Sequence, residues 1–200
     1  MKIAEQGIYF SWQGEGHLSG LPMVFVRLAG CSVGCLECDT DYRAHSALEP
    51  VEIAERCFEL LAPLADRWVW VTGGEPFDRD LKPLIDALHH RNLQVAVATS
   101  GHKRGLPPVD WLSVSPHNPQ QFVQSYGNEI KLVVGLNGLD PWRFLEMWPD
   151  SRTNFWFRFV QPLWNGKDVC KESVRMCLQF VKEHPNWGLS WQTHKLWQTP

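Results

Sequence analysis

Three cysteines with the spacing Cys-x3-Cys-x2-Cys are the residues of this chain best suited to chemistry. Cys31, Cys35 and Cys38 lie within eight residues of one another. Thiolates are the usual protein ligands of iron–sulfur clusters, and an electron-transfer cluster normally takes four of them. Three thiolates with no adjacent fourth ligand favour a 4Fe-4S cluster in which one iron stays open. The spacing therefore predicts a site where a cluster acts on another bound molecule.

Other uses of these three thiols fit the sequence less well. A structural zinc site needs four closed ligands, usually as two pairs, and Asp39, Asp41 and His45 form no second pair. Disulfides are disfavoured because the sequence opens without an apolar signal segment and has half its cysteines in one short run. We therefore expect a reducing cytoplasm. The remaining cysteines are expected to be buried small hydrophobic residues: Cys57, Cys170 and Cys177.

Length and charge indicate one enzyme domain that spans residues 1–200. A chain of 200 residues can enclose one sizeable core, and its composition marks no boundary inside it. The net charge of -3 and the lack of a Lys/Arg run give no attraction to nucleic acid. The apolar stretches are too short, and too often interrupted by charge, to predict a membrane span.

Short runs rich in β-branched and aromatic residues alternate with longer helical patterns, which is typical of repeated βα units and a parallel sheet. Strands are predicted at 23–28, 68–72, 94–99, 111–115, 130–134, 155–160 and 189–192. Helices are predicted at 51–65, 80–91, 141–147 and 167–183. The stretches 105–111 and 115–126 lack helical periodicity. We therefore expect an α/β fold, specifically an abbreviated, incomplete (β/α) barrel with a mostly parallel sheet.

The polar motifs follow the predicted strands, where parallel βα folds place their ligand sites. Arg27 and the cysteines follow the first strand, and Thr72-Gly73-Gly74-Glu75-Pro76 follows the second. A double glycine at a strand end lets the backbone approach a ligand closely, because neither residue has a Cβ. Alone, Gly-Gly is equally well explained as a tight turn. Together with the cysteines, it indicates a cofactor site.

The combination of Cys-x3-Cys-x2-Cys with a strand ending in Gly-Gly-Glu-Pro resembles the radical S-adenosylmethionine (SAM) superfamily. Further segments narrow the resemblance to the 7-carboxy-7-deazaguanine synthase family, in order along the whole chain. They are Ser-Trp-Gln-Gly-Glu-Gly at 11–16, Gly-Leu-Pro at 20–22, Cys-Asp-Thr at 38–40, Thr-Ser-Gly at 99–101, Ser-Val-Ser-Pro at 113–116, Glu-Ile-Lys at 129–131, Gln-Pro at 161–162 and Gln-Thr-His-Lys at 192–195.

The resemblance implies a lyase of queuosine biosynthesis, a tRNA modification pathway. Its reaction contracts the ring of 6-carboxy-5,6,7,8-tetrahydropterin to 7-carboxy-7-deazaguanine with loss of ammonia. Its cofactors would be a 4Fe-4S cluster, SAM and Mg2+. Reductive cleavage of SAM would give a 5′-deoxyadenosyl radical that takes the hydrogen from C6 of the pterin and later returns it. The radical comes from the cofactor, so no protein side chain is required as a catalytic base.

A pterin presents an amide and guanidine-like edge together with a carboxylate, which the substrate residues would have to bind. Gln13, with Trp12 and Gly14, can contact the heterocycle edge, and Glu15 can accept from its N–H groups. Arg27 can hold the carboxylate in a fork geometry that lysine cannot copy. By family position, three further residues meet the substrate: Thr72, His194 and Pro200, the last through a terminal carboxylate.

The resemblance also assigns the metal and SAM contacts. Cys31, Cys35 and Cys38 would bind the cluster, and Thr40, which alone would be read as a helix cap, would bind Mg2+. SAM would contact four segments: Glu37, Cys38 and Asp39; Gly74; Ser115, Pro116 and His117; and Gln161, Pro162, Leu163 and Trp164. His117 departs from the family, where lysine is usual, and Ser32 stands where asparagine is usual.

The expected partners are the small-molecule pterin, a flavodoxin- or ferredoxin-like reductant and a second copy in a homodimer. Two alternatives stay open. Another small radical SAM enzyme, such as a glycyl-radical activase, would share the cysteines but has no need of Gln13-Gly14-Glu15-Gly16 together with Arg27. A non-catalytic iron–sulfur redox module would show no turnover.

Overall fold

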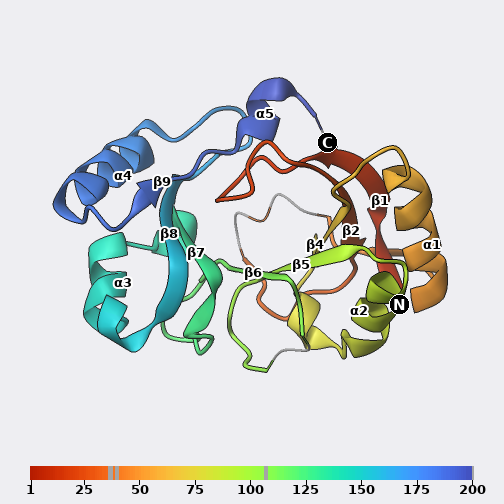
Figure 1. Cartoon of the computed structure of the whole chain (residues 1–200). Helices are drawn as coiled ribbons and strands as arrows, with labels where there is room; N and C mark the ends of the chain where they lie inside the picture. Colours follow the sequence, from red (N-terminus) through yellow and green to blue (C-terminus); the bar gives the residue numbers. More distant parts are fainter. Residues whose placement is uncertain (36–37, 39–40, 106–107, 200) are drawn as a thin grey trace.

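The computed structural model describes residues 1–35, 38, 41–105 and 108–199. Its strands form one nine-stranded sheet with the order β3-β1-β2-β4-β5-β6-β7-β8-β9. β1 pairs antiparallel with β2 and β3, and every later pair, from β2·β4 to β8·β9, is parallel. Figure 1 shows this sheet as an open curve with helices on its outer side. The predicted incomplete barrel with a mostly parallel sheet is therefore the observed architecture.

The strands and helices have the following bounds. The strands are β1 (Lys2–Trp12), β2 (Pro22–Leu28), β3 (Ala44–Ala47), β4 (Trp68–Gly73), β5 (Gln94–Thr99), β6 (Trp111–Val114), β7 (Tyr126–Val134), β8 (Asn154–Pro162) and β9 (Gly188–Leu189). The α-helices are α1 (Pro50–Leu61), α2 (Lys82–His90), α3 (Pro141–Met147), α4 (Lys171–Glu183) and α5 (Thr193–Trp197), and the 3-10 helices are η1 (Pro76–Asp78), η2 (Leu136–Gly138) and η3 (Asp150–Arg152). Within the described ranges, no helix combines the length and apolar composition needed to cross a bilayer.

Alternation along β2 separates the core from the site. Val24 and Val26 point to the outer face and are fully buried in the main hydrophobic core, which α1, α2, α3 and α4 cover. Met23, on the other face, belongs to a second, smaller core inside the curve. Phe25 and Arg27 follow on that inner face and line a cavity. Because successive side chains of a strand point to opposite faces, one strand supplies both the core and the site.

The same arrangement recurs in β4. Trp70 lies in the inner core and Thr72, two residues on, lines the cavity. The parallel register pairs Arg27 with Thr72 across β2 and β4. Inner residues are therefore apolar at the N-terminal ends of these strands and polar at the C-terminal ends, which places the site at the C-terminal edge of the sheet.

Local signals explain where several helices begin. Glu49, the N-cap residue, and Glu52 form a capping box at the start of α1, and Pro50 occupies its first turn. Asp140 caps α3 by accepting a hydrogen bond from Arg143 N at 3.0 Å. All four predicted helices overlap observed ones, α1 to α4, although α1 ends at Leu61 rather than at residue 65 and α4 begins at Lys171 rather than at residue 167.

Several predictions about elements were wrong. β1 and β3 were not expected, and the strand predicted at 189–192 is the two-residue β9, followed by α5. Cys170 was expected to be buried within a helix, but it is half-buried because it precedes α4 as its N-cap residue. Cys57 and Cys177 are buried as predicted.

Candidate active site

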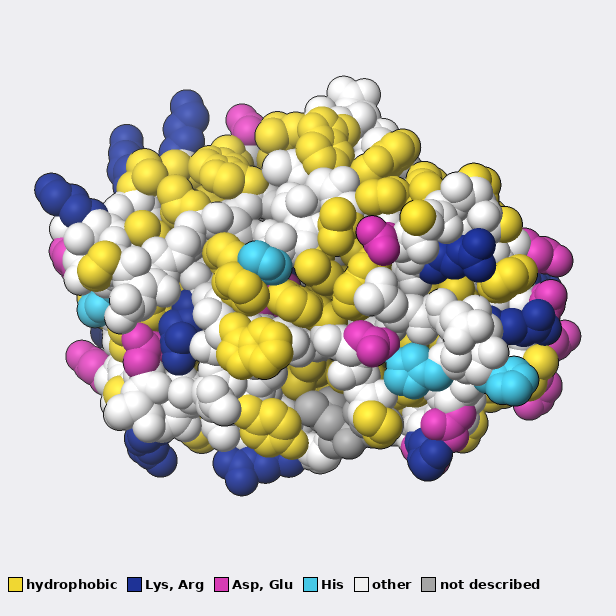
Figure 2. Space-filling model, in the orientation of Figure 1, with side chains coloured by type: hydrophobic (Ala, Val, Ile, Leu, Met, Phe, Trp, Pro, Cys, Tyr) yellow, Lys and Arg dark blue, Asp and Glu magenta, His cyan; other side chains and the backbone are white. Residues whose placement is uncertain are grey.

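A cavity of about 260 Å³ opens at the C-terminal edge of the sheet and takes its lining from both ends of the curve. Its walls include all three motif cysteines, the Gly-Gly-Glu-Pro turn, the loop after β1 and the segment around α5. On the face seen in Figure 2, hydrophobic side chains gather in the middle, and most Lys and Arg side chains lie toward the periphery. The segments singled out in the sequence therefore meet in one place.

The cysteine loop lies against the Gly-Gly-Glu-Pro turn with almost no space between them. A Cβ on Gly74 would lie 1.8 Å from the carbonyl oxygen of Gly30, so only glycine fits there. Gly74 N donates to Leu28 O at 2.7 Å and Glu75 N donates to Gly30 O at 3.1 Å. The double glycine thus forms a turn and also lets the backbone of Gly74 pack against that of Gly30. These contacts fix the residues immediately before Cys31.

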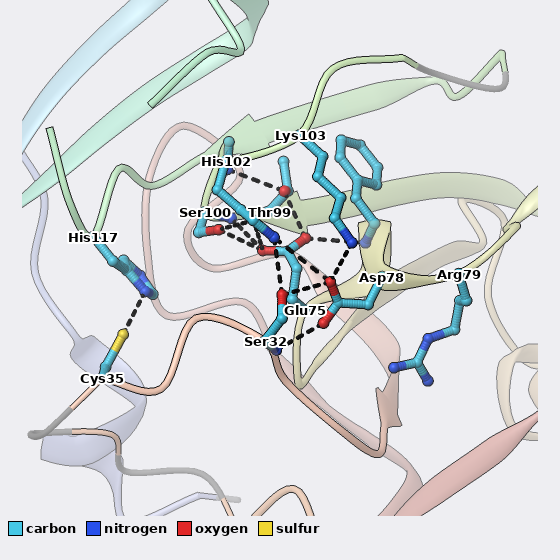
Figure 3. A network of polar contacts seen from close by, with 12 residues as sticks. Ser32, Cys35, Glu75, Asp78, Arg79, Thr99, Ser100, His102, Lys103 and His117 are labelled. Atoms are coloured by element: carbon cyan, nitrogen blue, oxygen red, sulfur yellow. Dashed lines mark hydrogen bonds and ion pairs between the residues drawn. The ribbon is translucent and has the colours of Figure 1, made fainter. Parts of the chain in front are cut away.

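Glu75 is buried behind this turn and accepts four hydrogen bonds (Figure 3). Its Oε1 accepts from Phe77 N at 3.0 Å and from Thr99 Oγ1 at 2.7 Å. Its Oε2 accepts from Ser100 N at 2.8 Å and from Ser100 Oγ at 2.6 Å. A buried carboxylate with this many donors is fully satisfied by the protein. Glu75 therefore shapes the turn from behind and joins it to the end of β5.

The opposite wall carries charge from the loop after β1. Glu15 Oε2 accepts a hydrogen bond from Lys131 Nζ, and Glu15 Oε1 accepts from Gln192 Nε2 at 2.7 Å. Lys131 is buried on β7, and burial lowers its pKa from 10.5 to about 7. Glu129 lies two residues before Lys131 on β7, and burial raises the pKa of its carboxyl. This carboxylate accepts hydrogen bonds from His17 N at 2.8 Å and from Ser113 Oγ at 2.6 Å.

Gln13 has a donor that the described part of the protein leaves unused. Its Oε1 accepts from Glu15 N at 3.1 Å, but Nε2 is buried without a hydrogen-bond partner. The side chain lines the cavity. A buried amide N–H without a partner is costly, and a ligand in the cavity is the natural acceptor.

Arg27 reaches the cavity from the end of β2. Its Nε donates to Tyr9 Oη at 2.8 Å, and its Cζ lies 5.7 Å from the centre of the Tyr9 ring. The Tyr9 ring in turn stacks on Phe25, with ring centres 5.4 Å apart. Tyr9, itself stacked on Phe25, therefore fixes the position of the Arg27 guanidinium.

The segment around α5 closes onto the loop after β1. Thr193 N and Thr193 Oγ1 both donate to Gly14 O at 3.0 Å. A Cβ on Gly14 would lie 2.1 Å from His194 Nδ1. Glycine at position 14 therefore lets His194 pack directly onto the loop and reach the cavity wall, 180 residues away in the chain.

Comparisons with known proteins agree with this geometry. The chain is 32% identical over 219 residues to the 7-carboxy-7-deazaguanine synthase of Burkholderia multivorans, with 100% of both chains covered. It is 31% identical over 218 residues to the enzyme of the same name from Escherichia coli K12, with 92% of each covered. The crystal structure of QueE from Escherichia coli matches with a TM-score of 0.69 and 27% identity, over 96% of this chain and 94% of that one. No protein-family model matches the chain.

The chain belongs to the 7-carboxy-7-deazaguanine synthase family. The predicted fold class is confirmed by the match to QueE, and the predicted activity, a radical SAM lyase of queuosine biosynthesis, is confirmed by the full-length relatives. The other radical SAM enzyme and the non-catalytic module weighed on the sequence are therefore set aside.

For a 7-carboxy-7-deazaguanine synthase, the predicted site residues mostly meet at the cavity. The predicted substrate residues that line it are Trp12, Gln13, Gly14, Glu15, Arg27, Thr72 and His194, and the predicted SAM residues that line it are Cys38, Gly74, Ser115, His117, Gln161, Leu163 and Trp164. Pro116 and Pro162 are buried but lie outside the lining. Nδ1 of His117 lies 3.0 Å from Cys35 Sγ, so this residue is beside a predicted cluster ligand.

Four predicted site residues lie outside the described residues: Glu37, Asp39, Thr40 and Pro200. The Mg2+ contact of Thr40 and the terminal carboxylate of Pro200 therefore stay predictions. Lys131 and Gln192 are among the residues of the cavity wall that were not predicted as site residues, although both belong to motifs that resemble the family's. A lysine in the otherwise apolar end of a central strand was the signal that could have identified Lys131.

Proposed function

We propose that this cavity holds the 4Fe-4S cluster on Cys31, Cys35 and Cys38, with SAM and the carboxypterin beside it. The three thiols form no disulfide, line one cavity and lie next to a glycine turn that brings backbone close to a ligand. In the described part of the chain, no three His, Cys, Asp or Glu side chains converge on a single ion. Thiolates are the usual protein ligands of an iron–sulfur cluster, so this donor set fits one.

When bound, the cluster and SAM supply one-electron radical chemistry on the pterin, and the protein groups orient and enclose the substrate. Arg27 pairs with the substrate carboxylate, and Thr72, its neighbour across the strands, contacts the same end. Mg2+ on Thr40 would share that carboxylate. The polar edge of the heterocycle faces Gln13 and Glu15.

The unpartnered Nε2 of Gln13 carries this proposal, since it sits in the same cavity as the thiols and needs an acceptor. The ring carbonyl of a pterin is such an acceptor, and Glu15 beside it accepts from the ring N–H groups. Lys131 and Gln192 hold the Glu15 carboxylate in place for this role. The wall is therefore complementary to an edge that presents both a carbonyl and N–H groups.

The expected electron donor is a flavodoxin- or ferredoxin-like protein. Cys38 is exposed and Cys31 is partly exposed, so the cluster loop can be approached by a small redox protein. The homodimer stays a prediction from the family.

One anaerobic experiment tests this function. The reconstituted chain is mixed with SAM, a chemical reductant and 6-carboxy-5,6,7,8-tetrahydropterin, with Mg2+ present or left out, and the product is followed by its ultraviolet spectrum. We expect a deazapurine chromophore without net consumption of SAM, and faster turnover with Mg2+. Irreversible SAM cleavage with the pterin unchanged, or a purified chain that holds zinc, would contradict the proposal.

A further inference from the structure

The residue directly after Cys31 is held by a carboxylate that the sequence motifs do not include. Ser32 N donates to Asp78 Oδ2 at 2.8 Å, and Ser32 Oγ donates to Asp78 Oδ1 at 2.6 Å (Figure 3). Both donors of Ser32 thus end on one side chain. Asp78 is the last residue of η1, immediately after the Gly-Gly-Glu-Pro turn.

Two further side chains support the pair of Ser32 and Asp78. Lys103 Nζ donates to Asp78 Oδ1 at 2.7 Å, and His102 Nε2 lies 3.0 Å from Ser32 Oγ. Only 17% of the Asp78 side chain is exposed. Burial opposes its charge, but hydrogen bonds from Lys103 and Ser32 outweigh that effect and lower the pKa of Asp78 to about 2. We call Ser32, Asp78, His102 and Lys103 the cluster-loop clamp.

The clamp is continuous with the Gly-Gly-Glu-Pro turn. Nδ1 of His102 lies 2.9 Å from Ser100 Oγ, the hydroxyl that donates to Glu75. Arg79, next to Asp78, donates from Nη2 to Ala29 O at 2.7 Å. Residues on both sides of Cys31 are therefore fixed by one short segment, 75–79.

We propose that Asp78 is a positioning residue for the cluster, which holds the Cys31 segment in its ligating conformation before the cluster arrives. The inference rests on the proposed function, because it assumes that Cys31 is a cluster ligand. The physical reason is entropic: a loop already fixed by charge-assisted hydrogen bonds loses less conformational freedom on ligation than a free one. Asp78 would thus orient the cluster ligand Cys31 through the neighbouring residue, Ser32.

The first test needs no cluster. Hydrogen exchange is followed by mass spectrometry on the full-length chain purified without iron, using peptides that contain Ser32. Asp78→Ala should speed exchange there by about tenfold or more, since a hydrogen bond to a charged group is lost. Asp80→Ala is the matched control: Asp80 is exposed and accepts from Lys82 N at 2.9 Å, away from the cysteine loop. Equal exchange in the wild type and Asp78→Ala would overturn the proposal.

The second test measures how the reconstituted chain keeps its cluster. Iron loss to a chelator should be about tenfold faster in Asp78→Ala than in the wild type or Asp80→Ala, and the spin-resonance signal of the reduced cluster should change shape. Asp78→Asn, which keeps an acceptor for Ser32 but loses the charge facing Lys103, should fall between them and guards against misfolding of the alanine variant. Identical iron loss and spectra in all four proteins would overturn the inference.

The two proposals fail in different ways. If the wild type takes up no 4Fe-4S cluster, the proposed function is wrong, and with it the role of Asp78 toward the cluster, whatever the exchange at Ser32. If the wild type forms a cluster and turns over while the Asp78 variants behave like it, only the inference is wrong.

Discussion

The two walls of the cavity differ in how far the protein satisfies its own polar groups. On the side of the motif cysteines, which we call the cluster wall, Glu75 lines the cavity and accepts four hydrogen bonds, and Asp78, outside the lining, accepts three. On the side of the loop after β1, which we call the substrate wall, Gln13 keeps a buried N–H without a partner, and Glu15 forms an ion pair with the buried Lys131. The first wall uses its polar groups to shape backbone, and the second keeps them directed at the cavity.

This difference indicates where ligand recognition resides. A buried donor left unpaired costs about 1–3 kcal/mol, and one that lines a cavity, as in Gln13, is available to a bound ligand. Replacing the unpaired group of the substrate wall should therefore change the substrate KM, whereas replacing groups that are paired within the protein, on either wall, should change stability or cluster retention.

The largest effect is expected from Lys131→Met, which leaves the partly buried Glu15 without its cation. Breaking one side of a buried ion pair typically costs about 3–5 kcal/mol, and the free energy of unfolding in urea should fall by that amount. The double variant Lys131→Met with Glu15→Gln should recover a large part, because the uncompensated charge is gone. A loss below about 1 kcal/mol in the single variant would show that the pair contributes little.

Arg27→Lys should lower kcat/KM for the carboxypterin by about a hundredfold, because lysine cannot offer the paired donors of the guanidinium. Losing one charge-assisted hydrogen bond is worth about 1.5–3 kcal/mol, which corresponds to this range. Steady-state kinetics would measure it. Arg43→Lys is the control, since Arg43 is an exposed residue paired with Asp41 and should leave the kinetics unchanged. Wild-type kinetics in Arg27→Lys would remove Arg27 from carboxylate binding.

Much of this site could be predicted from the sequence because its parts are local motifs. The cysteine spacing, the Gly-Gly-Glu-Pro turn and Arg27 at the end of an apolar strand are each visible within a few residues. The fold followed from the alternation of strands and helices. β1 was missed because its polar residues, including Lys2 and Glu5, interrupt the apolar pattern.

The contacts between distant segments could not be predicted. Glu15 and Lys131 are 116 residues apart, and Gln192 lies 177 residues from Glu15. Nothing in the local sequence around any of them specifies the other two, since curvature of the sheet brings them together. Asp78 was missed for a similar reason: as the end of a turn it looks like a surface residue, and its role depends on the cysteine loop folding back over it.

Gln13→Leu should raise KM for the pterin about tenfold while kcat changes less, because only the contact of Nε2 with substrate is removed. Stability should change by less than about 1 kcal/mol, since the lost bond to Glu15 N is offset by removing an unpaired buried donor. Gln124→Leu is the matched control: Gln124 is fully buried, donates to Tyr126 O at 2.9 Å and lies outside the cavity lining. It should change stability and leave KM alone. The opposite pattern would assign Gln13 to the fold rather than to the substrate.

The smallest effect concerns acid stability on the cluster wall. Because the pKa of Asp78 is lowered from 3.8 to about 2 in the folded chain, its carboxylate stabilises the fold above about pH 4, and this contribution is lost as the pH falls toward 2. The difference in unfolding free energy between the wild type and Asp78→Asn should therefore shrink by about 1 kcal/mol over that window. Asp41 has a pKa of about 2 for a different reason, the hydrogen bond from exposed Arg43, and surface pairs contribute little. Urea unfolding at pH 4.5 and pH 2.5 should thus separate Asp78→Asn from Asp41→Asn. If the unfolding free energies of both variants differ from the wild type by the same amount at the two pH values, Asp78 stabilises the fold no more than a surface charge does.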